Sequence, residues 1–159
     1  DTAVQLPPDR HEMRGTFAAD IYLSSEPWDF SKGNAEITIG ESHPFQQGKD
    51  EVSDVTRENT GDYGIRYHIT VKTKGGGKYK LYINPMGGVY MGTFEIGQNP
   101  KLLRTYRTDG TLGKVWFGDG TMESCLPAGT WQAGKDLYIR FIPAGAAYLP
   151  LRFLLVAGD

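Results

Sequence analysis

The sequence has only one cysteine, Cys125, in 159 residues, so no disulfide can form within the chain. This excludes the small secreted domains that rely on several disulfides in place of a large hydrophobic core. Long hydrophobic runs are also missing, since the longest apolar stretch, residues 149–157, is interrupted by Pro150 and Arg152. It is shorter than the roughly 20 apolar residues that a membrane-spanning helix needs, so we expect no membrane insertion.

The chain has no excess of charge of either sign. It contains 17 basic and 19 acidic residues, and its formal net charge is −2. Proteins that bind nucleic acid mainly through the phosphate backbone carry a surplus of lysine and arginine. We therefore expect no nucleic-acid partner.

Recognisable catalytic and metal-binding motifs are missing as well. There is no Gly-x-Ser-x-Gly motif, and His11, His43 and His68 lie far apart, without the spacing typical of a zinc site. Cys125 has no base near it in the sequence. We expect a protein that is not an enzyme, although a catalytic triad or a carboxylate pair assembled in space stays open.

The chain is rich in glycine and contains segments in which apolar and polar residues alternate. It contains 21 glycines and 9 prolines, and 12% of its residues are aromatic, which is typical of short strands joined by tight turns. Between residues 63 and 73 the apolar residues fall on odd positions and the polar ones on even positions, as in a strand with one face on a core. The strands predicted along the chain are 13–23, 35–39, 63–73, 78–84, 89–96, 102–107, 114–117, 136–142 and 151–156.

These eight or nine strands predict an all-β fold. We expect a single two-sheet antiparallel β-sandwich of jelly-roll or immunoglobulin-like type, with a closed barrel as the alternative. It would form one domain at residues 13–159. Residues 1–12, which contain Pro7 and Pro8, are predicted to be an extended N-terminal arm.

Three local features follow from the same pattern. Residues 63–73 and 78–84 are predicted to form a hairpin across the triple glycine at 75–77. The last strand, 151–156, is hydrophobic on both faces, which predicts a central or covered position. Residues 126–129 contain a Pro-x-Gly sequence that predicts a turn.

Residues 40–62 lack periodicity and are rich in acidic side chains, which predicts a long loop. Calcium is bound by several carboxylate and carbonyl oxygens gathered by flexible backbone. Asp50, Asp54 and Asp62 are therefore candidate calcium ligands. No calcium-loop spacing is present, and the alternative is a solvated acidic loop.

Two further groups of residues are candidates for ligand binding. Trp28 follows Pro27 and is predicted to be exposed, and Tyr82 and Tyr90 lie in tyrosine-rich strands, so their rings are candidates for stacking on sugars. Lys74 and Lys78 flank the triple glycine and predict a positive tip for an anionic glycan, a phosphate or an acidic partner. The alternatives are aromatic packing in the core and lysines that protect a sheet edge from aggregation.

Several segments resemble a domain of secreted bacterial proteins, especially of Gram-positive lineages, some of which carry a stalk-like domain described as copper amine oxidase-like. The similar segments are 63–71 (YGIRYHITV), 81–88 (LYINPMGG), 92–94 (GTF), 143–145 (PAG) and 148–152 (YLPLR). The resemblance implies export and a role at the cell surface or in the matrix, and it brings no catalytic residues. The chain begins at Asp1 rather than at Met, which is also expected of a mature exported protein or of a shortened chain.

The function expected from these observations is a non-enzymatic exported module, structural or binding, at the cell surface or in the extracellular matrix. We expect self-assembly in which residues 1–12 of one copy add a strand to the next copy. The partners would be other copies of the chain or cell-surface glycans. The alternative is a carbohydrate-binding module that uses exposed aromatic residues, with calcium as a candidate ion.

Overall fold

The computed structural model describes residues 16–40, 45–50, 53–108, 118–119, 121, 123–144 and 149–158. The predicted arm at 1–12 and the predicted strand at 114–117 lie outside the described residues. The all-β prediction is confirmed, because the described residues form thirteen strands and a single 3₁₀ turn, Phe30–Lys32, with no α-helix among them. No helix in this part of the chain is long and apolar enough to cross a membrane.

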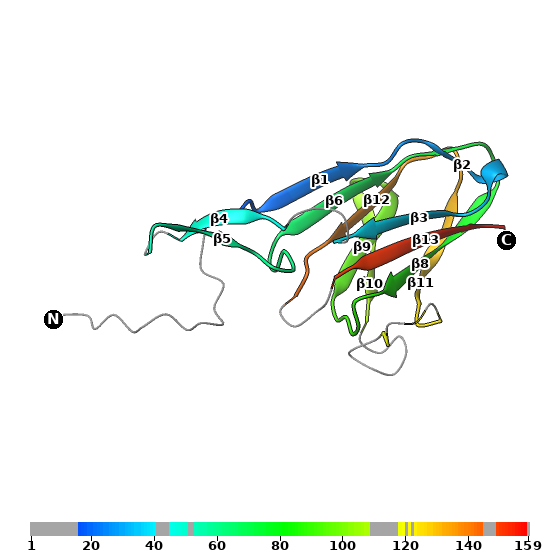
Figure 1. The fold of residues 1–159 in the computed structure, drawn as a ribbon. Coiled ribbons are helices and arrows are strands. Elements are labelled where there is room, and N and C mark those ends of the chain that lie inside the picture. The colour runs from blue at the N-terminus through cyan, green and yellow to red at the C-terminus, as the bar shows by residue number, and fades with distance from the viewer. Residues whose placement is uncertain are drawn as a thin grey trace.

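Nine of the strands form two larger sheets (Figure 1). The five-stranded sheet has the order β1 (Asp20–Ser24), β6 (Arg66–Val71), β12 (Leu137–Phe141), β9 (Thr93–Asn99) and β10 (Leu102–Arg107). The four-stranded sheet has the order β11 (Leu126–Gln132), β8 (Lys78–Pro85), β13 (Leu151–Ala157) and β3 (Ala35–Ile39). Two small sheets pair β2 (Trp28–Asp29) with β7 (Thr73–Lys74) and β4 (Gln47–Asp50) with β5 (Val55–Glu58).

The inner faces of the two larger sheets share one hydrophobic core. Odd-numbered residues of β6 and β12 are buried, as period-two alternation requires. The rings of Phe94 and Phe141 in the five-stranded sheet lie 6.2 and 5.7 Å from the ring of Phe153 in the four-stranded sheet. The architecture is therefore sandwich-like. It differs from a single two-sheet antiparallel fold because it has four sheets and because β1 runs parallel to β6 and β2 parallel to β7.

The predicted hairpin between 63–73 and 78–84 is wrong. β6 belongs to the five-stranded sheet and β8 to the four-stranded sheet, so the triple glycine carries the chain from one sheet to the other. Gly75 and Gly77 have φ angles of +87° and +89°, which only glycine adopts at little cost. A corner between two sheets and a hairpin both need alternating strands around a glycine-rich turn, so the sequence pattern is the same for both.

Two other segments also differ from the prediction. Residues 40–62 are not one loop, because they contain the β4–β5 hairpin, which extends away from the two larger sheets (Figure 1). All four residues of β5 are exposed, so its sequence has no alternation to reveal it. Residues 126–129 are not a turn but the start of β11, where a register shift between Pro127 and Thr130 accommodates Gly129 at φ +91°.

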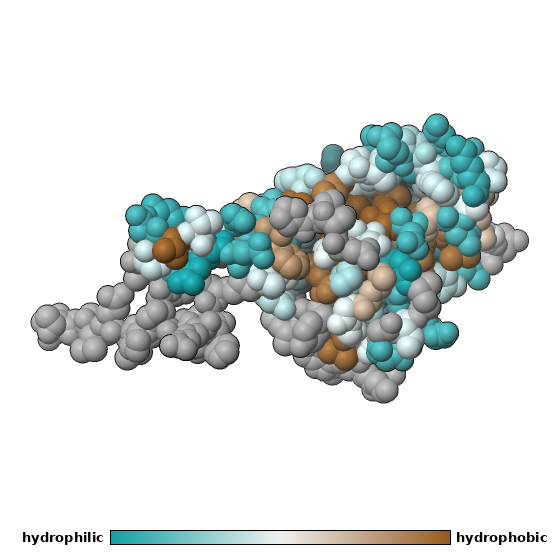
Figure 2. Space-filling model, viewed as in Figure 1, coloured by the Kyte–Doolittle hydropathy of each residue, from teal (hydrophilic) through white to brown (hydrophobic). Residues whose placement is uncertain are grey.

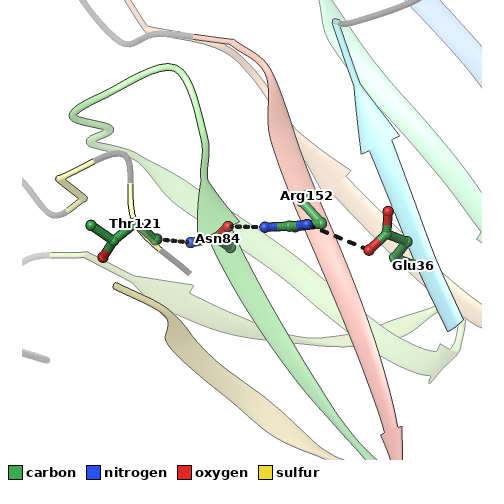
Figure 3. A network of polar contacts seen from close by, with 4 residues as sticks. All are labelled: Glu36, Asn84, Thr121 and Arg152. Carbon is green, nitrogen blue, oxygen red and sulfur yellow. Dashed lines mark hydrogen bonds and ion pairs between the residues drawn. The ribbon is translucent and has the colours of Figure 1, made fainter. Parts of the chain in front are cut away.

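The prediction for the last strand is confirmed. β13 lies between β8 and β3, with Leu151, Phe153 and Leu155 buried on its inner face. Its outer face carries a polar network (Figure 3), in which Asn84 is 1% exposed. The amide nitrogen of Asn84 donates hydrogen bonds to the carbonyl oxygens of Thr121 and Ser124 at 2.9 and 3.0 Å.

Arg152 completes this network. Its Nη2 donates to Oδ1 of Asn84 at 2.9 Å, and its Nη1 lies 3.5 Å from the carboxylate of Glu36. One buried amide thus joins β8 and β13 to the segment that contains Thr121 and Ser124 (Figure 3). Loss of one partner would leave buried polar groups without hydrogen bonds, which costs free energy. The network therefore stabilises the position of Thr121 and Ser124 on the outside of the four-stranded sheet.

Hydrophobic surface is visible between β1 and β3, which are edge strands of the two larger sheets (Figure 2). Ile21 and Leu23 of β1 and Ile37 of β3 pack against the core but are only partly buried. In the described part of the chain, β1 pairs only with β6 and β3 only with β13. This side of the molecule, called here the β1–β3 seam, presents unpaired backbone groups beside partly exposed apolar side chains.

Candidate functional site

The outer face of the five-stranded sheet carries one continuous row of polar and aromatic side chains. The inward residues of these strands are apolar, so alternation places the intervening residues on the outside. The strand register then sets them side by side: Tyr22 is opposite His68, His68 opposite Arg140, Arg140 opposite Glu95, and Glu95 opposite Thr105. Directly opposite residues have Cβ atoms roughly 5 Å apart, so neighbours in this row are within reach of the same ligand.

The β1 end of this row has a defined geometry, because His68 contacts both Asp20 and Tyr22. Its Nε2 lies 2.7 Å from Oδ1 of Asp20, and its ring stacks on Tyr22 with 4.4 Å between ring centroids and 9° between planes. Asp20 also lies 3.7 Å from Nη1 of Arg66. Tyr22 is 75% exposed even though one side of its ring lies against His68. The sheet therefore presents a fixed aromatic ring to solvent.

A groove of about 590 Å³ lies beside this cluster. Its volume is in the range of sites that bind small molecules. It is lined by Arg66, His68, Thr93, Glu95, Arg140 and Ile142 among others. The lining comes from β6, β9 and β12 and from the residues that follow β12, so three neighbouring strands build the groove.

The polar groups of the groove have unused hydrogen-bonding capacity. Within the part of the chain that the structure describes, Arg140 makes one long side-chain hydrogen bond, from Nη2 to the carbonyl oxygen of Pro100 at 3.4 Å, and no ion pair. In the same part of the chain the carboxylate of Glu95 and the hydroxyl of Thr93 make no hydrogen bond. Open donors and open acceptors therefore face one hollow.

None of the five ligand-binding residues predicted from the sequence lines this groove. Tyr90 is 1% exposed and stacks on Phe94 in the core, which leaves no ring face for a ligand. Trp28 is half-buried, and its indole nitrogen donates to the carbonyl oxygen of Gly33 at 3.1 Å. Tyr82 is half-buried on β8, in the other large sheet.

The two predicted lysines are exposed and lie on either side of the triple glycine, Lys74 in β7 and Lys78 in β8. Lys78 also lines a second hollow of about 390 Å³ together with Arg104 and Trp131. There the guanidinium of Arg104 lies 6.0 Å from the centre of the Trp131 ring, so the ring already has a cation beside it.

The three predicted calcium ligands each have a protein partner. Asp50 is buried and accepts a hydrogen bond from the hydroxyl of Ser53 at 2.7 Å, whereas Asp54 is exposed and lies 2.6 Å from Nζ of Lys49. Asp62 is buried, where its carboxylate accepts hydrogen bonds from Tyr67 and from the backbone of Gln46. Among the described residues, no three His, Cys, Asp or Glu side chains are placed to hold one metal ion.

The sequence contained a partial signal for the groove. The even positions of the strand at 66–71 carry Arg66 and His68, two ionisable groups on the outer face of one strand. What sequence reasoning missed is the pairing of His68 with Arg140 and of Arg140 with Glu95. Those residues lie about 45 to 70 positions apart along the chain, and strand order is not encoded in periodicity.

Comparison with known proteins gives no further assignment of the site. No protein-family model matches the chain. No curated protein matches it either.

Proposed function

We propose that the protein is a non-enzymatic saccharide-binding module with a β-sandwich of jelly-roll or immunoglobulin-like type. The observation that carries the proposal is the exposed Tyr22 ring, stacked on His68 beside the polar groove. Sugars offer an apolar ring face and many hydroxyl groups. The Tyr22 ring can stack on the apolar face of a sugar. The open groups of Arg140, Glu95 and Thr93 can form hydrogen bonds with its hydroxyl groups.

The proposal of a binding module rather than an enzyme has physical support. Burial raises the pKa of the Cys125 thiol, which disfavours the thiolate that a nucleophile would need. The polar groups at the groove lie in a row across β6, β12 and β9, with an open donor beside an open acceptor. This arrangement serves recognition of hydroxyl groups by hydrogen bonds.

Export and a place at the cell surface or in the extracellular matrix are part of the same proposal. Their support is the resemblance of five short segments of the chain to a domain of secreted bacterial proteins. Cell-surface or matrix glycans would then be the saccharides within reach of the groove.

Replacement of Tyr22 by alanine is expected to weaken saccharide binding about tenfold, which corresponds to ~1.4 kcal/mol. The loss of the stacking face supplies this effect, because an aromatic contact contributes on the order of 1 kcal/mol beyond its buried area. Binding would be measured by calorimetry against the strongest ligand found in a panel of neutral and acidic oligosaccharides. Stability should change little, since Tyr22 is 75% exposed.

Leu102→Ala is the matched control, because Leu102 is also 75% exposed but lies on β10, at the opposite edge of the five-stranded sheet from Tyr22. It should bind saccharides as well as the unmodified chain. A flat titration of the unmodified protein across the whole panel would contradict the proposal, as would equal binding by Tyr22→Ala.

We also propose, as a second function, self-assembly through the β1–β3 seam. The unpaired backbone of β1 and β3 beside partly buried Ile21, Leu23 and Ile37 is what a strand added from another copy would use. Residues 1–12 contain Val4 and Leu6, which could supply apolar side chains to that seam. Contacts of this kind propagate into filaments when they do not close.

Deletion of residues 1–12 is expected to convert assemblies of the full chain into folded monomers, because the donor strand is then missing. Mass in solution would be measured by light scattering for both chains, with and without calcium, followed by negative-stain imaging. Assembly that requires calcium would support an ion held by the acidic residues at 50–62. If the truncated chain assembles as the full chain does, the arm is not the donor.

A further inference from the structure

The charges around the groove point to the kind of saccharide that it takes. Two guanidinium groups, those of Arg66 and Arg140, line the groove, but only one carboxylate, that of Glu95, does so among the described residues. The other acid of the cluster, Asp20, lies within 2.7 Å of His68 and 3.7 Å of Arg66. Because Asp20 already has these partners, the charged groups of the groove that have no ion-pair partner among the described residues are Glu95 and Arg140, and Arg140 is the one that can attract an anion.

Arg140 is placed to receive a carboxylate. It lies in the middle of the row, on β12, the central strand of the sheet, between His68 on β6 and Glu95 on β9. Its guanidinium has five N–H donors, of which one makes a long hydrogen bond to the carbonyl oxygen of Pro100. A planar fork of open donors binds a carboxylate through two parallel hydrogen bonds.

The order of the row also orients the ligand. Tyr22, His68, Arg140 and Glu95 follow one another across four neighbouring strands. A sugar ring on Tyr22 would direct its substituents across His68 toward Arg140 and Arg66. Glu95, at the far side of Arg140, would repel a carboxylate but accept hydrogen bonds from sugar hydroxyls.

We propose that the groove selects acidic saccharides of the uronic-acid type, in which a sugar ring carries a carboxylate. This inference rests on the proposed saccharide-binding function and names the substrate class of the same site. The carboxylate binds between Arg140 and Arg66, and the ring lies on Tyr22. The hydroxyl groups of the sugar are held by Glu95 and Thr93.

The test compares a short oligo-uronic acid with its methyl ester, since esterification removes the negative charges of the carboxylates and adds only one methyl group to each. The acid is expected to bind the unmodified protein at least about tenfold tighter than the ester, as one charge-assisted bidentate contact allows. The preference should shrink as salt is added, because the groove is open to solvent. Calorimetry at low and at physiological ionic strength measures both effects.

Two variants with opposite expected effects test the assignment of residues. Arg140→Gln should remove the preference for the acid, so that the acid and the ester bind equally. Glu95→Gln should tighten binding of the acid severalfold, because the repelling carboxylate is gone and the amide still accepts hydrogen bonds. Lys72→Gln, which removes one positive charge from an exposed side chain outside the groove, is the control for net charge.

The outcomes separate this inference from the proposed function. Equal binding of acid and ester overturns the inference and leaves saccharide binding standing, whereas no binding of either, or of any other saccharide, overturns both. If Lys72→Gln weakens binding of the acid as much as Arg140→Gln does, the effect is one of net charge and the assignment of Arg140 is overturned. Glu95→Gln keeps the test decisive if Arg140→Gln fails to fold.

Discussion

Raising the pH above 10 is expected to destabilise the protein steeply, by about 4 kcal/mol per pH unit, because three buried tyrosines then oppose folding. Burial raises the pKa of Tyr67, Tyr79 and Tyr90 well above the ordinary value of 10.0. At Tyr67 the hydrogen bond that its hydroxyl donates to Asp62 raises the pKa further. The three side chains are 4%, 0% and 1% exposed, so the tyrosinate form has almost no access to water in the folded state.

The direction of this dependence follows from linkage. The unfolded chain loses these protons at about pH 10, whereas the folded chain keeps them, so the stabilisation is complete below pH 10 and is lost above it. Each such group costs about 1.36 kcal/mol per pH unit. By pH 12 the three groups remove about 8 kcal/mol, which is a large share of a domain stability of about 5–15 kcal/mol. Urea unfolding followed by circular dichroism at a series of alkaline pH values measures the slope.

Phenylalanine variants provide the control. The hydroxyl groups of Tyr79 and Tyr90 are buried and have no hydrogen-bond partner in the described part of the chain. Tyr90→Phe keeps the ring and removes the unsatisfied hydroxyl, so at pH 7 it should be as stable as the unmodified protein or more stable by about 1 kcal/mol. Its alkaline slope should fall by about one third. An unchanged slope in both Tyr79→Phe and Tyr90→Phe would refute the explanation.

Phe153→Ala is expected to destabilise the protein by about 3–5 kcal/mol, the usual cost of removing a fully buried aromatic side chain. Phe153 is 0% exposed and its ring is next to those of Phe94 and Phe141, which belong to the opposite sheet. The variant therefore removes contacts that join the two sheets, and it leaves a cavity between them. Urea unfolding at pH 7 measures the loss.

Leu154→Ala is the matched control, because Leu154 is the next residue of the same strand and points to the other face. Leu154 is only half-buried, so its loss should be clearly smaller than that of Phe153. If the two variants lose equal stability, the aromatic contacts between the sheets contribute less than the buried area indicates. Saccharide binding by either folded variant should not change, since neither residue lines the groove.

The candidate site shows why periodicity finds strands more easily than sites. The alternation of 65–71 placed His68 on an outer face correctly, and the structure confirms that Tyr67, Ile69 and Val71 face the core. A histidine alone on an outer face is ordinarily a surface residue. His68 differs from such a residue because it contacts Asp20 and stacks on Tyr22. Both residues reach it because β1 pairs parallel to β6. The parallel pairing of strands more than 40 residues apart leaves no local mark in the sequence.

The exposure of the aromatic residues also depends on the tertiary structure. Tyr90 and Tyr82 lie in similar tyrosine-rich segments, yet Tyr90 is in the core and Tyr82 is half-buried on the four-stranded sheet. Tyr22 lies in the predicted strand 13–23 and is not one of the predicted ligand-binding residues, yet it is the most exposed aromatic side chain of the described residues. Burial of a tyrosine depends on which sheet face its strand presents and on what covers that face.

The sequence by itself determined the all-β class, the positions of β3, β10, β12 and β13 to within about a residue or two, and the inward face of β6. These features are local, because the alternation of side chains has a period of two and glycine and proline mark the turns. Only the tertiary structure decided that the triple glycine joins two sheets and that Tyr22, His68, Arg140 and Glu95 form one row. Strand order and register arise from burial of all the strand faces together, so no single segment of the chain specifies them.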